Sequence, residues 1–226
     1  LVKPEGFKAT LDLDWLERGG LAGANLEYAR ERFSGYHMIY GVLDDEGEDD
    51  FGDEREDLDA PHERGRVLMR HKQFLPKDWQ LQFELSYICD RNFLEQFFPG
   101  EFYAGKEQET LAYAKKQVDN WALTALVKNR LNRFQSQAES VPDLGFYLLG
   151  QPLLKDTLTF FHESRAGVKR FKWDNALPGV HPSSWMPRLD LREELDLPLR
   201  AGAINLVPYV VGRATYWGDE FRSMRW

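Results

Sequence analysis

Apolar and polar residues alternate with a period of two along several stretches of the chain. The clearest stretch is 79–87, in which every odd position is apolar and every even position is polar. Successive side chains of a β-strand point to opposite faces, so this pattern predicts a strand with one apolar and one polar face. Residues 7–15 and 188–199 repeat the pattern, and residues 204–216 continue it less cleanly.

Further segments have the composition of strands. They are 21–30, 35–43, 65–74, 108–118, 121–132, 142–150 and 157–167. Together with the segments above they make about eleven strands of roughly ten residues, which is long for a globular sheet and usual for a tilted membrane strand. Because no convincing helical period separates them, neighbouring strands should pair in an antiparallel up-and-down meander. The predicted fold class is therefore all-β.

The connections between the predicted strands alternate in length. Short ones fall at 31–34, 75–78, 119–120, 151–156 and 200–202, and longer ones at 44–64, 89–107, 133–141 and 168–187. Outer-membrane barrels have short periplasmic turns and longer outer loops, whereas the Greek-key crossovers of a soluble sandwich tend to mix the lengths. The alternation, interrupted by a tight turn at 17–20, predicts that the meander forms part of an outer-membrane β-barrel.

Hydropathy and aromatic content agree with this prediction. The mean hydropathy is −0.55, and no stretch approaches the ~18 consecutive apolar residues of a membrane helix, which excludes a helical membrane protein. Aromatic residues make up 14% of the chain and gather near the predicted strand ends, where Tyr and Trp suit the water–hydrocarbon boundary. These residues are Trp15, Tyr28, Trp79, Tyr87, Trp121, Tyr216 and Trp217. The alternative is that large aromatic side chains fill the core of a soluble sandwich.

The net charge of −8 gives no basic footprint for nucleic acid, so no nucleic-acid partner is expected. Between Asp44 and Glu63 twelve acidic residues are opposed only by Arg55. Such a block repels itself, which predicts a solvated, mobile surface loop over 44–64. The alternative is a calcium site, since that ion prefers clustered carboxylate oxygens, although the spacing does not fit an EF-hand. Its ligands would be Asp49, Asp50 and Asp53.

No catalytic group stands out. Residues 100–107 match the spacing of a phosphate-binding loop, but Glu107 stands where a Ser or Thr is needed. His162, Glu163 and Ser164 are adjacent on a strand and point to alternate faces, so they form no relay. Cys89 is the only cysteine, and the histidines lack zinc-binding spacing. We therefore expect no enzyme activity, cofactor or resident metal.

The strand at 79–87 supplies the candidate functional surfaces. If the strand belongs to a barrel wall, one face meets lipid and the other lines the lumen. The predicted lipid-facing residues are Trp79, Leu81, Phe83, Leu85 and Tyr87. The predicted lumen-facing residues are Gln80, Gln82, Glu84 and Ser86.

Two segments around this strand resemble a known family. Residues 71–79 read His-Lys-Gln-Phe-Leu-Pro-Lys-Asp-Trp, and residues 87–95 read Tyr-Ile-Cys-Asp-Arg-Asn-Phe-Leu-Glu. They are similar to the lipopolysaccharide-assembly outer-membrane protein family (LptD, the organic-solvent-tolerance protein), and the likeness covers nearly the whole chain in order. The residues of the family-like motif are His71, Gln73, Phe74, Leu75, Pro76, Trp79, Asp90, Asn92 and Phe93.

The resemblance implies a wide barrel in the bacterial outer membrane that inserts lipopolysaccharide into the outer leaflet through a lateral opening. It also implies a plug lipoprotein, periplasmic bridge proteins and outer-membrane lipid as partners, and no enzyme activity. Residues 1–226 would form a partial barrel domain, without the family's N-terminal periplasmic domain and the remaining strands. The alternatives are another outer-membrane channel or porin-like barrel, and a soluble all-β carbohydrate-binding module.

Overall fold

The computed structural model describes residues 6–16, 19–45, 49, 51, 61–179, 181 and 183–218. Its strands are β1 Gly6–Leu16, β2 Gly19–Ala29, β3 Phe33–Leu43, β4 Arg64–Leu75, β5 Trp79–Ile88, β6 Thr110–Val118, β7 Trp121–Asn129, β8 Gln137–Leu153, β9 Leu158–Lys172, β10 Met186–Asp196, β11 Leu199–Ala201, β12 Ile204–Leu206 and β13 Tyr209–Trp217. Two short helices, α1 Phe93–Phe97 and α2 Pro99–Tyr103, lie between β5 and β6.

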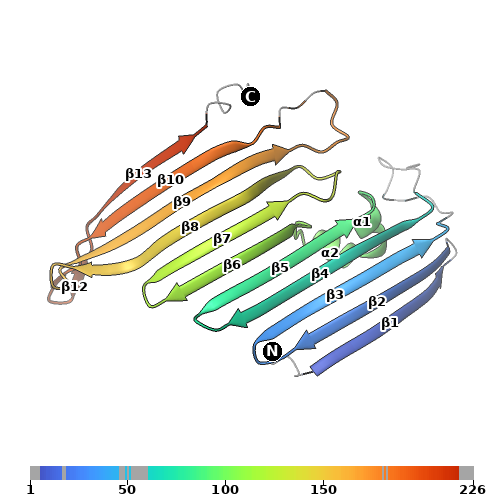
Figure 1. Cartoon of the computed structure of the whole chain (residues 1–226), viewed down its shortest axis with the longest axis horizontal. Helices are drawn as coiled ribbons and strands as arrows, with labels where there is room; N and C mark the ends of the chain where they lie inside the picture. Colours follow the sequence, from blue (N-terminus) through green and yellow to red (C-terminus); the bar gives the residue numbers. More distant parts are fainter. Residues whose placement is uncertain are drawn as a thin grey trace.

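One sheet of 11 strands forms the body of the structure (Figure 1). The strands follow one another in chain order from β1 to β10, and β13 pairs with β10. Every neighbouring pair is antiparallel, and β11 and β12 form a separate hairpin. This arrangement confirms the prediction of an all-β, antiparallel, up-and-down meander.

The register gives the sheet two chemically distinct faces. Residues paired across neighbouring strands point to the same side, so the odd residues of β5 share a face with His71 on β4 and Ala112 on β6. We call this the apolar face and the opposite side the polar face. The apolar face carries Leu11, Leu13, Ala22, Ala24, Ile39, Val67, Met69, Phe83, Leu85, Ala112, Ala125, Leu144, Leu189, Leu191 and Ala214. The polar face carries Asp12, Asn25, Tyr36, Arg70, Glu84, Tyr113, Thr124, Arg165, Asp190 and Arg213.

Large side chains of the apolar face are open to the surroundings. Leu13 is 81% exposed on β1, Ile39 is 56% exposed on β3, and Phe83 is 58% exposed on β5. Aromatic residues of this face stand near both ends of the strands. Phe7, Tyr28, Trp79 and Trp121 lie at one end, and Trp15, Tyr87 and Tyr216 lie at the other. Trp217 also ends a strand, but it belongs to the polar face because it pairs with Arg188.

The two edges of the sheet differ in the length of their connections. The short-connection edge holds the segments 30–32, 76–78, 119–120 and 154–157. The long-connection edge holds the segments 44–63, 89–109, 130–136 and 173–185. The predicted alternation of lengths is therefore present over most of the sheet. Its exceptions are the connection 17–18, which lies outside the described residues, and the connection 197–208.

Two prolines explain why the bounds predicted for the last two strands were wrong. The pattern predicts one strand over 188–199 and another over 204–216, with a short turn between them. In the structure β10 ends at Asp196 and β13 begins at Tyr209, with the β11–β12 hairpin inserted. Pro198 and Pro208 stand at these interruptions, where a missing N–H cannot continue a ladder.

Two predicted loops also contain secondary structure. β8 begins at Gln137, inside the predicted loop 133–141, and the register with β9 shifts between Ser140 and Asp143. Pro142 occupies this irregularity, which is a position that tolerates proline within a strand. The predicted loop 89–107 contains α1 and α2, which were not predicted.

No helix in the described part of the chain is long and apolar enough to cross a membrane.

Gly35 permits a close contact within the sheet. A Cβ atom there would lie 2.2 Å from Oη of Tyr28 and 2.7 Å from the carbonyl oxygen of Arg70. Gly41 lies on the same strand and face, and a Cβ atom there would meet only the carbonyl oxygen of Arg64, at 3.6 Å. We expect Gly35→Ala to lower the free energy of unfolding by about 1–3 kcal/mol through overpacking, and Gly41→Ala to change it little. Urea denaturation of the two purified variants measures the difference, and equal midpoints would contradict the packing argument.

Candidate functional site

Arg64, the first residue of β4, gathers acidic residues from two long connections on the polar face. Its guanidinium donates hydrogen bonds to both carboxylate oxygens of Asp49 (2.8 and 3.0 Å) and both of Asp90 (2.8 and 2.9 Å). A further bond of 3.2 Å reaches Asp45. The side chains of Arg64 and Asp45 are 0% exposed and that of Asp49 is 1% exposed. Bidentate pairs of this kind are strong because the planar guanidinium matches the carboxylate geometry.

Asp90 also starts the helical connection between β5 and β6. Its Oδ1 accepts hydrogen bonds from the backbone N–H groups of Asn92 and Phe93, both at 2.9 Å. These bonds satisfy donors at the beginning of α1, as a capping carboxylate does. Phe93 is 0% exposed and packs in a cluster with Leu21, Val42 and Ile88. Asp90 and Phe93 of the family-like motif therefore have structural roles, Asp90 as a capping carboxylate and Phe93 as a buried anchor.

The same connection is held to the sheet by a second arginine. Arg66, which is 1% exposed, donates hydrogen bonds of 2.7 and 2.9 Å to the two carboxylate oxygens of Glu101 on α2. Its guanidinium carbon lies 4.7 Å from the centre of the Phe98 ring, a cation–π contact. The hydrogen bonds from Arg66 lower the pKa of Glu101 below its ordinary value of 4.5. Figure 1 shows α1 and α2 together on one side of the sheet, behind β4 and β5.

Side chains complete the hydrogen bonding of β5 where its pairing with β6 ends. The register of β5 with β6 runs only as far as Glu84. Beyond it, Asn132 accepts a hydrogen bond from the backbone N–H of Ile88 (2.9 Å) and donates one to the carbonyl of Ser86 (3.1 Å). Ser86 is 0% exposed, and its hydroxyl donates to Oε1 of Gln108 at 2.6 Å. The connections 89–109 and 130–136 thus cover the polar face at its long-connection end.

The structure corrects the prediction for the acidic segment. Asp45 and Asp49 are buried and paired, so this part of the segment is not a solvated loop. Asp49, a candidate calcium ligand, has both of its oxygens engaged by Arg64, while Asp50 and Asp53 lie outside the described residues. No group of three His, Cys, Asp or Glu side chains in the described part of the chain could hold a metal ion. The sequence feature that could have indicated this pairing is Arg64, which directly follows the last acidic residue of the segment, Glu63.

Elsewhere on the polar face, two buried acids pair with basic residues of neighbouring strands. Asp143 on β8 accepts hydrogen bonds from Arg165 (2.7 Å) and Lys169 (2.6 Å) on β9. Asp190 on β10 accepts from Arg213 (2.7 Å) and from Thr215 (3.3 Å), both on β13. Cross-strand pairs of opposite charge give a hydrated surface without large uncompensated charge, which is suited to contact with water or polar ligands.

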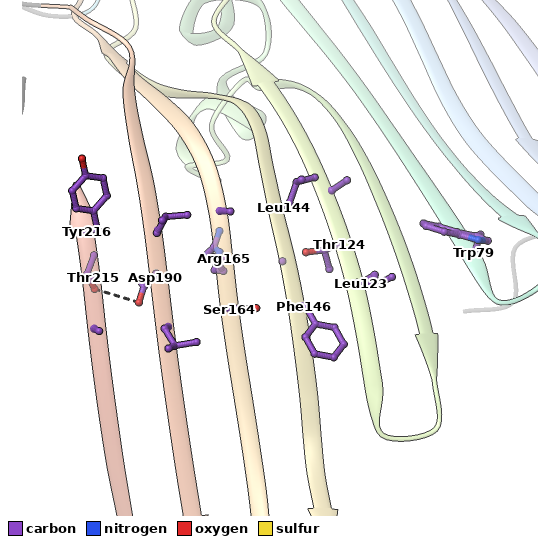
Figure 2. Close-up of a pocket in the computed structure, with 16 residues that line it drawn as sticks. Trp79, Leu123, Thr124, Leu144, Phe146, Ser164, Arg165, Asp190, Thr215 and Tyr216 are labelled. Atoms are coloured by element: carbon purple, nitrogen blue, oxygen red, sulfur yellow. Dashed lines mark hydrogen bonds between the residues drawn. The ribbon is translucent and has the colours of Figure 1, made fainter. Parts of the chain in front are cut away.

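The apolar face has a shallow trough of about 690 Å³ over β7 to β13 (Figure 2). Large and small side chains alternate across its strands, with Leu144 and Leu189 separated by Ala166 in one row. Figure 2 shows Trp79 and Tyr216 at opposite sides of this region, with Phe146 between them. The trough can accept an apolar chain.

The predicted site residues divide between these surfaces. Trp79, Leu81, Phe83, Leu85 and Tyr87 share the apolar face, and Gln80, Gln82, Glu84 and Ser86 share the polar face. That the first set meets lipid and the second a lumen stays a prediction. The family-like motif is not brought together at one place.

The members of that motif lie in three surroundings. His71, Gln73, Leu75 and Trp79 point to the apolar face and Phe74 to the polar face, while Pro76 begins the turn between β4 and β5. Asp90, Asn92 and Phe93 belong to the helical connection.

No protein-family model matches the chain, and no curated protein matches it.

Removing the buried guanidinium tests the role of Arg64. Arg64→Met removes the guanidinium that binds Asp49 and Asp90, and we expect it to lower the free energy of unfolding by about 3–5 kcal/mol. The matched control is Arg70→Met, because Arg70 is 38% exposed and pairs with Glu84 at the sheet surface. Its expected cost is below about 1 kcal/mol. Urea denaturation measures both, and a mild effect of Arg64→Met would show that the cluster does not hold the long connections.

Acid should release α2 from the sheet. The folded-state pKa of Glu101 is below 4.5, so its stabilising contribution is complete above pH 4.5 and is lost as the pH falls through the folded-state value. We expect protease cleavage within 89–109 to accelerate in that acidic range. Glu101→Gln, which cannot ionise, should show rapid cleavage at neutral pH as well. A variant as resistant as the unaltered protein at neutral pH would contradict this role.

Proposed function

We propose that this chain forms part of the wall of an outer-membrane β-barrel. The observation that carries the proposal is the exposed, mainly apolar face that extends across the meander and is bordered by aromatic residues near both strand ends. Soluble monomers rarely expose a contiguous apolar patch larger than a few hundred Å². In a membrane the apolar face contacts hydrocarbon, so it no longer carries the free-energy cost of exposure to water. The aromatic residues near the strand ends suit the two membrane–water interfaces.

The polar face suits the lumen of the same barrel. Asp143 and Asp190 on this face pair with basic residues of neighbouring strands, and its side chains can hydrogen-bond water. The short-connection edge would lie on the periplasmic side, and the long connections would lie outside. In this arrangement the helical connection held by Arg64 and Arg66 covers the outer end of the polar wall. The location that follows is the bacterial outer membrane.

Within this class, the function we favour is the insertion of lipopolysaccharide into the outer leaflet. Its support is the resemblance of residues 71–95 to the lipopolysaccharide-assembly family. A polar lumen could hydrate the sugar–phosphate head group while the acyl chains leave sideways into the membrane. The partners would be lipopolysaccharide, outer-membrane lipid, a plug lipoprotein and periplasmic bridge proteins. The chain itself would perform no covalent chemistry.

The second candidate is a channel for small solutes. The observation that favours it is the helical connection 89–109, which packs against the polar face and would narrow a pore. Depletion of the full-length protein in its own cells separates the two functions. A transporter of lipopolysaccharide should leave newly made lipopolysaccharide unable to reach the cell surface, with solute uptake unchanged. Normal surface delivery together with lost solute uptake would favour the channel.

Two substitutions on β3 test whether the apolar face meets hydrocarbon. Ile39, near the middle of the strand, is 56% exposed, and Leu43, at its end, is 65% exposed on the same face. In a membrane, Ile39→Arg should cost about 2–4 kcal/mol of folding free energy and Leu43→Arg about 0–1 kcal/mol, because the penalty depends on depth. Unfolding of the full-length protein in lipid vesicles measures both. If the face is exposed to water, both substitutions should change the folding free energy by the same small amount. That result would overturn the wall proposal.

A further inference from the structure

Four polar residues form a connected group on the mainly apolar face, near the short-connection edge. We call Tyr28, His37, His71 and Gln73 the tyrosine–histidine cluster. The hydroxyl of Tyr28 lies 3.1 Å from Nε2 of His37 and 2.7 Å from Nδ1 of His71. Nε2 of His71 lies 3.4 Å from Oε1 of Gln73. Two of the four, His71 and Gln73, belong to the family-like motif, and neither takes part in the contacts around Arg64.

The sheet is shaped to bring these residues together. Gly35 stands opposite Tyr28 on one side and opposite His71 on the other. Because Gly35 has no side chain, the Tyr28 ring passes over it and reaches His71 on the next strand but one. The contact between Tyr28 and His71 therefore depends on the same close approach that leaves no room for a Cβ atom at Gly35.

A pocket of about 430 Å³ opens beside the cluster. It is lined by the four residues of the cluster and by Met69, Leu81, Gln82 and Phe83. A ligand that fits this lining has a polar head that accepts hydrogen bonds and an apolar portion next to it.

The hydrogen bonds of the cluster leave donors for such a ligand. If Nε2–H of His71 donates to Gln73 and Tyr28 donates to Nδ1 of His71, then Nε2–H of His37 can donate to the hydroxyl oxygen. The amide N–H groups of Gln73 then meet no acceptor among the described residues.

A permanent cation lies at the same corner of the sheet. The guanidinium carbon of Arg30 is 5.3 Å from the centre of the Phe7 ring, and that ring is 5.9 Å from the ring of Tyr28. Hydrogen-bond donors beside an apolar floor suit a phosphodiester attached to hydrocarbon, and Arg30, which does not line the pocket, adds positive charge at the neighbouring strand end.

We propose that the tyrosine–histidine cluster binds the phosphodiester head group of a phospholipid, whose glycerol esters and first acyl carbons pack on Met69, Leu81 and Phe83. The inference rests on the proposed wall function, because a lipid-facing surface brings phospholipid to this pocket. The short-connection edge places the site at the inner leaflet of that membrane. Inorganic phosphate offers the same oxygens but makes no use of the apolar floor.

Lipid binding to the full-length protein in detergent micelles tests the proposal. The probe is dioctanoyl phosphatidylglycerol, and the comparison ligands are dioctanoylglycerol, which lacks the phosphate, and inorganic phosphate. Native mass spectrometry across a concentration series gives each affinity. We expect phosphatidylglycerol to bind, and His71→Leu and Gln73→Leu each to weaken binding about tenfold, as the loss of one hydrogen bond to a charged group does. Lys116→Gln removes a charge from the same face outside the pocket and should leave the affinity unchanged.

Three outcomes would overturn the proposal: equal binding of dioctanoylglycerol, equal binding of inorganic phosphate, or unchanged affinity in both His71→Leu and Gln73→Leu. If His71→Leu fails to fold, Gln73→Leu decides alone. Failure here is distinguishable from failure of the wall proposal. If Ile39→Arg costs more folding free energy than Leu43→Arg but the protein shows no lipid selectivity, only the head-group proposal is contradicted. If the two substitutions cost the same, the wall proposal itself is contradicted.

Discussion

The structure depends on one constraint, which is that the period-two alternation stays in register from strand to strand. Within a strand, alternation separates apolar from polar side chains, and antiparallel pairing carries that separation to the neighbour. A shift of one residue in any ladder would reverse the faces for every strand beyond it. The ladders of β1 to β7 run without irregularity, and the shifts in β8 lie outside the central rows of the two faces. A wall with one apolar and one polar side follows from this constraint.

The long-connection end depends on a second kind of interaction. Arg64 and Arg66 lie two residues apart on β4, so their side chains point to the same face. Both are buried. Arg64 binds carboxylates from the connections on either side of the β4–β5 hairpin, and Arg66 binds Glu101 of the connection 89–109. A buried guanidinium is stable only with such partners, and the partners would be unstable without it. The two arginines therefore make the position of the helical connection and that of the acidic segment depend on each other.

Polar interruptions of the apolar face have a consistent place. The tyrosine–histidine cluster, Lys116, and the pair formed by His162 and Glu193 all lie in the half of the sheet nearer the short connections. The opposite half of that face is more uniformly apolar between its aromatic borders. An asymmetric face of this kind suits a membrane with different surroundings on its two sides, and it distinguishes the ends of the sheet without reference to connection length.

The sequence by itself determined the fold class, the strand positions near the middle of each ladder and the two faces, because alternation is a local property that pairing preserves. It also separated the long connections from the short ones. Tertiary structure alone decided that Asp45 and Asp49 are buried, that α1 and α2 form, and that Asn132 replaces a strand partner for Ser86 and Ile88. It alone brought Tyr28, His37 and His71 together over Gly35. These features depend on contacts between segments far apart in the chain, and no periodicity records which distant charge, ring or amide will meet a given residue.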